Sequence, residues 1–360
     1  MVKKLSLYVV LSLLWCNVAQ ALPDCEGSDF TKWTNCVGTY TDDKLNYYYS
    51  GEFGDKPGLR HGIGKMNVDG GHFIYIGEFK NSKPDGLGFS KLKGETHVGQ
   101  FKETIRHGWG ITIKADGNKI LGQWEEDHVS GYANVIGAGD YLILMKGNFK
   151  KSKLIKSSRH IQPQCKGDYV SPKVSKDWTN CRGQAEIVGA GIMYDADFVN
   201  GIPTGIASVR LFDGPLAKET GFATGIYVGE LKISKSNNWG ERDGMGVHIA
   251  DKDGTIQVGE WKEGFYDGKG ITSWPNGDIF IGELKKNLRH GKGHYMHQDG
   301  GSHSGEYKDG KEHGYGIETY ADGRKYAGEY KDGIKHGKGI CTDSSGISTD
   351  CKMENGIWVK

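Results

Sequence analysis

Histidines followed by glycine recur along the chain, and such residues could serve acid–base chemistry or bind a metal. They occur in Arg60-His61-Gly62, Arg106-His107-Gly108, Arg289-His290-Gly291 and Lys335-His336-Gly337. Aspartate fills the same slot in Pro84-Asp85-Gly86, Arg242-Asp243-Gly244 and Tyr266-Asp267-Gly268. A slot that accepts either residue is typical of a hydrogen-bonding turn position. The densest group of possible metal ligands is His290, His294, His297 and His303. His294 and His297 are an odd number apart, so on a strand they would face opposite sides. We therefore expect no metal.

Glutamates form a second row that could supply paired carboxylates. A glycosidase holds two such groups roughly 5–9 Å apart. The row comprises Glu52, Glu78, Glu230, Glu260, Glu283, Glu306 and Glu329. These residues recur once per repeating unit, opposite an aromatic face and often before lysine, so a solvated row of charges is the simpler explanation. The sequence also lacks the G-x-G-x-x-G, P-loop and G-x-S-x-G motifs. We expect no enzyme activity, no cofactor and no small-molecule substrate.

These residues belong to a motif that returns every 23 residues. It reads Phe280-Ile-Gly-Glu-Leu284, His303-Ser-Gly-Glu-Tyr307 and Tyr326-Ala-Gly-Glu-Tyr330. Weaker copies extend through both halves of the chain, which is the sign of one structural unit stacked many times. The chain has 360 residues, 57 of them glycine, and this glycine content disfavours long helices.

Each unit has the pattern of a β-hairpin. Tyr326, Gly328 and Tyr330 alternate, so on a strand they share one face. Asp332-Gly333 is a turn signal because glycine accepts a positive φ. An isolated hairpin is barely stable in water, so the units must stack to bury their rings.

The unit Tyr-x-Gly-Glu-Tyr-Lys-Asp-Gly-x-x-His-Gly-x-Gly resembles the MORN repeat (membrane occupation and recognition nexus). The resemblance covers roughly residues 49–150 and 194–360. It implies an all-β fold of two elongated single-layer antiparallel arrays of hairpins, each with a shallow groove. It also implies a role in membrane contact or scaffolding. The segment Leu22–Gly38 is similar to the leading cysteine-containing segments of exported bacterial MORN proteins.

Export and disulfide bonds are expected from the N-terminus and the cysteines. Residues 1–21 have the form of a signal peptide, with Lys3 and Lys4, an apolar run and an Ala-Gln-Ala cleavage pattern. We therefore expect a periplasmic or extracellular protein, possibly associated with a membrane. Six cysteines remain, in three close pairs, and zinc is the alternative to disulfides. The pairs are Cys25 and Cys36, Cys165 and Cys181, and Cys341 and Cys351.

A duplicated cysteine loop, which we call the Cys loop, divides the chain. Trp33-Thr-Asn-Cys36 returns as Trp178-Thr-Asn-Cys181, so each half opens with a Cys loop that would cap a sheet edge. We expect a signal peptide at 1–21, a Cys loop and first array at 22–150, a basic linker at 151–164, and a second Cys loop and array at 165–360. Cys341 and Cys351 are symmetric about Gly346, so we expect them directly opposite each other in a final hairpin.

A protein partner in an aromatic groove is the favoured function, because a single-layer sheet cannot bury both faces by itself. Core packing is the other explanation for these rings. The expected binding face comprises Phe53, Phe79, Phe101, Trp124, Trp239, Trp261, Tyr307, Tyr326 and Tyr330. Two insertions, Asp213–Thr224 and Ile233–Arg242, could be binding edges or loose spacers. The basic stretch 146–160 favours anionic lipid as an alternative partner. Without residues 1–21 the chain has 44 basic and 45 acidic residues, a balance that predicts no nucleic-acid binding.

Overall fold

The computed structural model describes residues 22, 25–138, 143–154, 165, 179–187, 191–212, 224–234 and 240–359. These residues form two antiparallel sheets in which each strand pairs with its neighbours in the chain. The first sheet, array 1, has 11 strands: β1 (Cys36–Asp42), β2 (Tyr47–Phe53), β3 (Arg60–Val68), β4 (Phe73–Lys80), β5 (Lys83–Leu92), β6 (Glu95–Lys102), β7 (Ile105–Ile113), β8 (Lys119–Glu125), β9 (His128–Ile136), β10 (Ile143–Lys150) and β11 (Lys153–Leu154).

The second sheet, array 2, has 15 strands: β12 (Cys181–Ile187), β13 (Ile192–Val199), β14 (Ile202–Leu211), β15 (Gly225–Ile233), β16 (Gly240–Ala250), β17 (Ile256–Lys262), β18 (Phe265–Ser273), β19 (Ile279–Lys285), β20 (Leu288–Met296), β21 (Ser302–Lys308), β22 (Lys311–Thr319), β23 (Lys325–Lys331), β24 (Ile334–Thr342), β25 (Ser348–Glu354) and β26 (Ile357–Val359). Two short 3-10 turns, η1 (Phe30–Lys32) and η2 (Asp69–Gly71), accompany array 1. No helix among the described residues is long and apolar enough to span a membrane.

The predicted hairpin unit is confirmed. Asp332 and Gly333 have φ values of 53° and 88°, so both turn residues are left-handed and the strands they join keep their natural twist. Within each hairpin the pairing also shifts at the Gly-Glu-aromatic segment. For example, Gly77 pairs with Gly88, whereas Phe79 pairs with Pro84. This bulge bends each strand locally.

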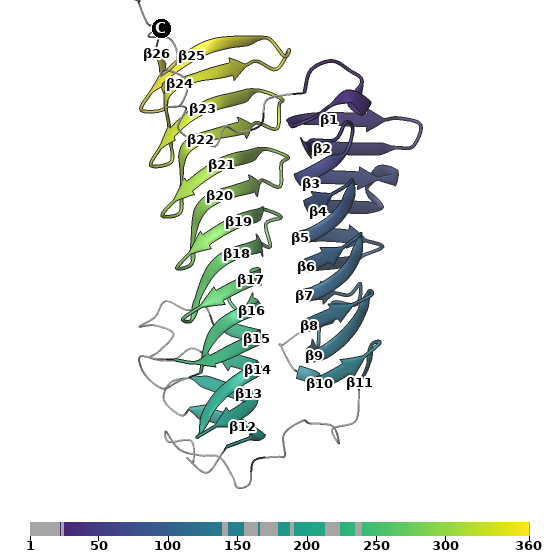
Figure 1. Cartoon of the computed structure of the whole chain (residues 1–360), viewed down its shortest axis with the longest axis vertical. Coiled ribbons are helices and arrows are strands. Elements are labelled where there is room, and N and C mark those ends of the chain that lie inside the picture. Colours follow the sequence, from purple (N-terminus) through teal and green to yellow (C-terminus); the bar gives the residue numbers. More distant parts are fainter. Residues whose placement is uncertain are drawn as a thin grey trace, which may run out of the picture.

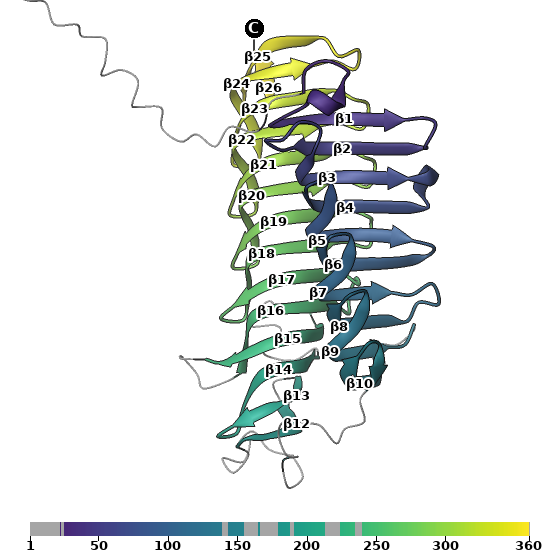
Figure 2. The ribbon, with the colours of Figure 1, turned by 45° about the vertical axis from the view of Figure 1, so that its right-hand side comes forward.

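The two arrays pack face to face and run in opposite directions (Figures 1 and 2). Contacts between arrays join β5 to β18, β6 to β17, β7 to β16, β8 to β15 and β9 to β14. The contacting faces are those opposite the rings, and we call them the inner faces. Their residues form one apolar cluster that draws on both arrays and includes Ile111, Leu121, Val228, Val258 and Ile271. Each single-layer sheet therefore buries its second face against the other array.

Array 2 is longer than array 1, and its last strands extend past β1 (Figure 1). We call β23–β26 the overhang. Large apolar side chains are more exposed there than in the sandwich: Ile340 is 46% exposed and Ile347 is 64% exposed. Cys341 and Cys351 form the predicted disulfide. The prediction that they lie directly opposite is wrong, because Cys341 pairs with Thr349 and Cys351 with Gly339. The hairpin turns one residue earlier than symmetry about Gly346 requires, so the disulfide is diagonal.

The two other disulfides hold the Cys loops against the first strand of each array. Cys25 bonds to Cys36 and Cys165 bonds to Cys181. The backbone N–H of Cys25 donates to the carbonyl of Val37 at 2.9 Å, and that of Cys165 donates to the carbonyl of Arg182 at 3.0 Å. Each Cys loop thus satisfies part of an open sheet edge, as predicted. Array 1 itself includes Lys153–Leu154, so it extends into the segment assigned to the linker.

Candidate binding site

The aromatic side of array 1 is a continuous ladder of rings. Trp33, Phe53, Tyr49 and Phe79 follow one another with edge-to-face contacts and ring centroids 5.1–5.4 Å apart. The series continues through Tyr75, Phe101, His97 and Trp124. Such pairs stabilise a fold by roughly 0.5–1.5 kcal/mol each beyond their burial. The ladder is thus the core of the array.

Glycine pairs beneath the rings let the ladder form. Gly77 faces Gly88 across the sheet, and the Tyr75 ring lies over this pair. A Cβ atom on Gly88 would lie 2.4 Å from the Tyr75 hydroxyl oxygen, which real structures do not tolerate. The hydroxyl donates instead to the carbonyl of Glu78 at 3.0 Å. The alternation of ring and glycine is therefore a packing requirement.

The glutamate row is solvated only in part: Glu260, Glu283 and Glu329 are exposed, whereas the other four are half-buried, and members of the row accept backbone N–H groups. Glu78 Oε2 accepts the backbone N–H of Leu87 at 2.6 Å, and Glu52 Oε1 accepts that of Ile63 at 3.2 Å. Burial raises the pKa of the Glu52 carboxyl. In two units glutamine replaces glutamate, at Gln100 and Gln123, and Gln100 Oε1 accepts the N–H of Trp109 at 2.8 Å. A neutral amide accepts the same backbone N–H as a carboxylate, so the role of this row does not require a charge. Its side chains satisfy backbone N–H groups at the bulge.

The histidine-or-aspartate slot forms hydrogen bonds, as predicted, but it lies within a strand and not in a turn: Asp85 is in β5 and Asp267 is in β18. Asp85 Oδ2 accepts the backbone N–H of Glu103 at 3.2 Å, and Asp267 Oδ2 accepts that of Lys286 at 3.1 Å. Both acceptors connect one hairpin to the turn of the next. His294 lies on the inner face, where its Nδ1 contacts Ser304, whereas His303 lies in the aromatic ladder beside Tyr307. Among the described residues, no cluster of three or more His, Cys, Asp or Glu could hold a metal ion.

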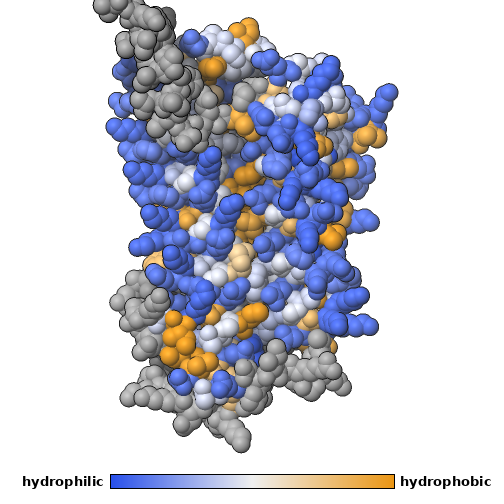
Figure 3. Space-filling view, viewed as in Figure 1, coloured by the Kyte–Doolittle hydropathy of each residue, from blue (hydrophilic) through white to orange (hydrophobic). Residues whose placement is uncertain are grey.

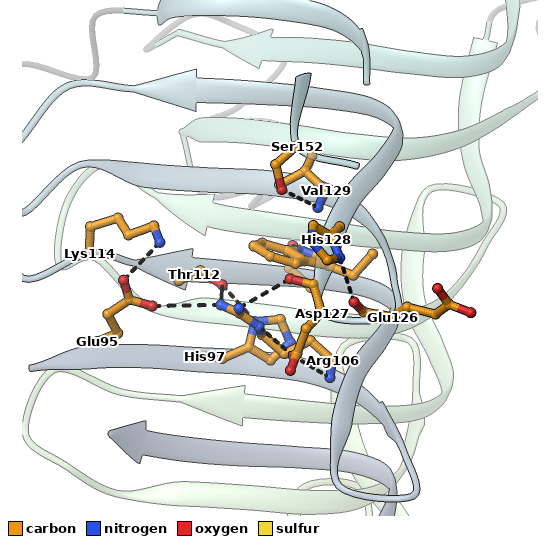
Figure 4. A network of polar contacts seen from close by, with 12 residues as sticks. Glu95, His97, Arg106, Thr112, Lys114, Glu126, Asp127, His128, Val129 and Ser152 are labelled. Atoms are coloured by element: carbon orange, nitrogen blue, oxygen red, sulfur yellow. Dashed lines mark hydrogen bonds and ion pairs between the residues drawn. The ribbon is translucent and has the colours of Figure 1, made fainter. Parts of the chain in front are cut away.

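Where the residue before the histidine or aspartate is arginine or lysine, its side chain covers the rings. The Arg106 guanidinium lies 4.6 Å from the centroid of Trp124. Its Nε donates to Asp127 at 2.9 Å, and its Nη1 lies 3.7 Å from Glu95 (Figure 4). Arg289 covers Tyr307 in array 2 and donates to the carbonyl of Gly310 at 2.8 Å. These cations close the groove, and each has an acceptor.

The aromatic side of array 1 has an opening beside its first Cys loop. A pocket of about 330 Å³ lies there, and we call it the Cys-loop pocket. The half-buried rings of Phe30, Tyr40 and Tyr47 form its walls, and Leu45 is 69% exposed beside them. The pocket is lined by Phe30, Tyr40, Asp42, Leu45, Tyr47, Tyr49, Phe53, Gly58, Arg60 and Ser82. Aromatic walls with a few polar groups are typical of ligand sites.

A buried charge cluster joins the arrays at their other end. Arg182 Nη2 lies 3.0 Å from Asp195 Oδ1, and its Nη1 lies 3.3 Å from Asp197 Oδ1. The guanidinium also lies 4.4 Å from the ring centroid of Tyr132 in array 1. Beside it, Asn134 of β9 donates to Ser208 of β14 at 2.6 Å. Removing one partner of such a buried pair typically costs about 3–5 kcal/mol, so the cluster stabilises the fold-back.

Sequence reasoning missed this cluster, although a signal was present. The residue after the first ring of each unit is apolar in Ile76, Val98, Leu121, Val228, Val258 and Ile281. Asp195 occupies that slot in its own unit. Asp195 departs from this apolar majority, as do Ser50, Lys146 and Ser304 in their own units.

The expected binding-face residues that are described lie in the cores of the two arrays. They are at most 6% exposed: Phe53, Phe79, Phe101, Trp124, Trp261, Tyr307, Tyr326 and Tyr330. Trp239 lies outside the described residues, as do most of the two insertions and residues 155–160 of the basic stretch. The surface seen in Figure 3 is mostly hydrophilic, with apolar side chains gathered along the line between the arrays.

Comparison with solved structures finds only distant likeness. The SAS-4 (dCPAP) TCP domain of Drosophila melanogaster, in complex with a proline-rich motif of Ana2, is 13% identical with a TM-score of 0.26, covering 46% of this chain and 79% of that one. The TCP10 domain of Danio rerio CPAP, in complex with a STIL peptide, is 9% identical with a TM-score of 0.20, covering 88% and 98%. A virginiamycin B lyase of Staphylococcus aureus with quinupristin is 12% identical with a TM-score of 0.14, covering 92% and 73%. Likeness this weak says nothing about the function of the chain.

No curated protein matches the sequence. The family model described as MORN repeat matches six stretches, all within the strands that carry the aromatic ladders: 75–91, 97–119, 258–279, 280–302, 303–323 and 326–348. These six stretches of the chain are MORN repeats.

Proposed function

We propose that this chain is a non-catalytic binding or scaffolding protein whose partner is a protein segment lying on the outer, aromatic side of the arrays. One observation carries the proposal: the inner faces of array 1 and array 2 bury each other. The sides that remain for a partner are therefore the outer ones. Rigid sheets of stacked hairpins present such long surfaces without needing to move.

The partner would enter at the Cys-loop end of array 1. The rings of the ladder are buried and covered by cations such as Arg106, so they offer little area themselves. Phe30, Tyr40 and Tyr47 are half-buried and lie around an open pocket. Exposed aromatic surface next to a pocket is what anchors partner side chains at interfaces.

Site-specific photo-crosslinking in the native compartment tests this proposal. A photoreactive residue at Leu45, which is 69% exposed beside the Cys-loop pocket, should capture one discrete protein species. The same residue at Ile357, which is 68% exposed in the overhang, is the matched control for exposure and should not capture it. Equal capture at both positions, or capture at neither, contradicts the proposal.

We also propose that the chain acts after export, in the periplasm or outside the cell. The three disulfide bonds support this proposal, because disulfides persist in oxidising compartments. Cell fractionation with a thiol-reactive mass tag tests it: the exported chain should carry no reactive cysteine until reductant is added. Free thiols in the native chain would contradict it.

A second candidate function is binding to anionic lipid. Lys150, Lys151 and Lys153 are all exposed around the turn between β10 and β11. Lysines near a membrane contribute about 1 kcal/mol each at an anionic surface. Flotation with phosphatidylserine vesicles at low and high salt tests this function. Replacement of the three lysines by glutamine should then abolish a salt-sensitive association.

A further inference from the structure

Arg60 is the counterpart of Arg106, but it lacks the acidic partners. Arg60 pairs with Phe53 in its unit as Arg106 pairs with Phe101 in the other. The backbone N–H of Arg106 donates to Asp127, whereas that of Arg60 donates to Ser82. The two units thus correspond residue by residue, and Ser82 stands where Asp127 would be.

The second acidic partner is replaced as well. Glu95, which lies 3.7 Å from the Arg106 guanidinium, precedes the first ring of its unit by two positions. Tyr47 precedes Tyr49 by the same two positions. The guanidinium of Arg60 therefore lies over the Tyr47 ring, 5.4 Å from its centroid, whereas that of Arg106 faces the carboxylates of Asp127 and Glu95 (Figure 4).

This substitution leaves donors without acceptors in the Cys-loop pocket. Among the described residues, the one side chain that accepts a hydrogen bond from the Arg60 guanidinium is Met66, whose sulfur lies 3.7 Å from Nη1. The Tyr47 hydroxyl is buried and has no hydrogen-bond partner. Burial also lowers the pKa of Arg60, although the group stays charged. A desolvated cation beside an unpaired phenol is costly unless a ligand satisfies both.

We propose that the Cys-loop pocket binds a carboxylate carried by the partner protein segment, with Arg60, Tyr47 and Ser82 as its donors. The inference rests on the proposed function and names the group that the partner presents. A carboxylate accepts two N–H bonds from a planar guanidinium, and Tyr47 and Ser82 both line the pocket. The apolar body next to the carboxylate would pack against Phe30 and Tyr40, whose ring centroids are 3.9 Å apart.

Asp42, the acidic residue of the pocket, does not fill this role. Its Oδ1 accepts the backbone N–H groups of Lys44 at 3.0 Å and Leu45 at 3.2 Å, within the turn between β1 and β2. Its Oδ2 accepts the Tyr40 hydroxyl at 3.4 Å. Asp42 is therefore committed to the turn, and Arg60 keeps its donors for a ligand.

Two small probes of the same shape test the chemistry. N-acetylphenylalanine carries a carboxylate and an aromatic body, and N-acetylphenylalaninamide replaces the carboxylate with a neutral amide. NMR titration of the full chain should show shifts of the Arg60 Nε–H and Tyr47 ring signals with the carboxylate. The amide should bind at least about tenfold more weakly, since a charge-assisted bond is lost. Equal affinity, or no binding of the carboxylate at millimolar concentration, overturns the proposal.

Variants copied from the Arg106 unit give a second test. Tyr47→Glu and Ser82→Asp recreate the acidic partners that Arg106 already has, so Arg60 should become paired and the carboxylate should bind at least about tenfold more weakly. Glu95→Gln alters the paired unit and should leave carboxylate binding unchanged. Undiminished binding in both Tyr47→Glu and Ser82→Asp overturns the proposal.

The source of the carboxylate is resolved with peptides. The carboxylate could come from an acidic side chain or from a chain terminus. Peptides with an internal glutamate and an amidated C-terminus offer only the side chain, whereas peptides with a free C-terminus and no acidic residue offer only the terminus. Comparing the two sets shows which source binds. If Leu45 captures no protein but the carboxylate probe binds as described, the proposed function fails while the pocket chemistry stands. If Leu45 captures a protein equally well in Ser82→Asp and Tyr47→Glu, the carboxylate proposal fails and the proposed function stands.

Discussion

An identical tetrapeptide, Gly-Lys-Gly-Ile, occurs in both the sandwich and the overhang, and it isolates the contribution of packing between the arrays. Ile271 ends the first copy and is 0% exposed within the inner-face cluster. Ile340 ends the second copy at the same repeat position and is 46% exposed. Truncation to alanine removes the same three carbons from each. Each buried carbon contributes ~0.8 kcal/mol and the cavity left behind adds a further cost, so Ile271→Ala should lower the free energy of unfolding by about 2–5 kcal/mol. With half the burial and no closed cavity, Ile340→Ala should cost about 1 kcal/mol.

Urea unfolding followed by tryptophan fluorescence measures both costs. Ile111→Ala in array 1 should lower the same transition as Ile271→Ala, because both side chains lie in one cluster. Hydrogen exchange should show lost protection across both arrays for Ile271→Ala, and across β24 and β25 alone for Ile340→Ala. Equal costs for Ile271→Ala and Ile340→Ala, within about 0.5 kcal/mol, would refute face-to-face packing.

Three further predictions concern the glycines, the buried histidine and the last disulfide. Gly88→Ala should destabilise the chain by about 1–3 kcal/mol, because its Cβ would lie 2.4 Å from the Tyr75 hydroxyl; an unchanged melting temperature would contradict this. Burial lowers the pKa of His303 from 6.5 to about 4, so the unfolded chain binds the proton more tightly than the folded chain. The free energy of unfolding should therefore fall by up to about 3 kcal/mol as the pH drops from about 6.5 to about 4. Urea midpoints measured against pH should lose this component in the His303→Phe variant. Reduction of the Cys341–Cys351 bond should lower the local stability of the last hairpin by about 3 kcal/mol. Hydrogen exchange should then become faster in β25 than in β18. Equal protection of β25 with and without reductant would contradict this prediction.

Much of the fold follows from local chemistry that one unit displays. The ring–glycine alternation predicts which residues share a face, and the turn residues predict where each hairpin closes. The cysteine spacing predicts all three disulfides. The offset of Cys341 and Cys351 could not be predicted, because the register depends on the turn after Thr342, where Asp343 Oδ1 accepts the N–H groups of Ser345 and Ile347.

The packing of the two arrays was beyond the reach of the repeat pattern, because a period describes one unit and says nothing of what covers it. The inner slot does change along the chain: it is Ile281 within the sandwich, but Ala327 in the overhang. The slot residue alone does not mark which units face a partner sheet, because Ser50 in β2 and Ser304 in β21 also occupy it. The Cys-loop pocket likewise depends on departures from the repeat, Tyr47 and Ser82, which are visible only once the corresponding unit around Arg106 is known.

Because the two arrays run in opposite directions, hairpins can be inserted or deleted at few places without disturbing the packing between the arrays. Facing strands have labels that sum to 23 or 24, from β5 with β18 to β9 with β14. A hairpin gained or lost inside either array would displace every facing pair beyond it by two strands, roughly 10 Å, and would bring apolar slots opposite polar ones. Length could change without this cost only by matched events in both arrays, or beyond β22. A hairpin added to the overhang would leave every facing pair in place.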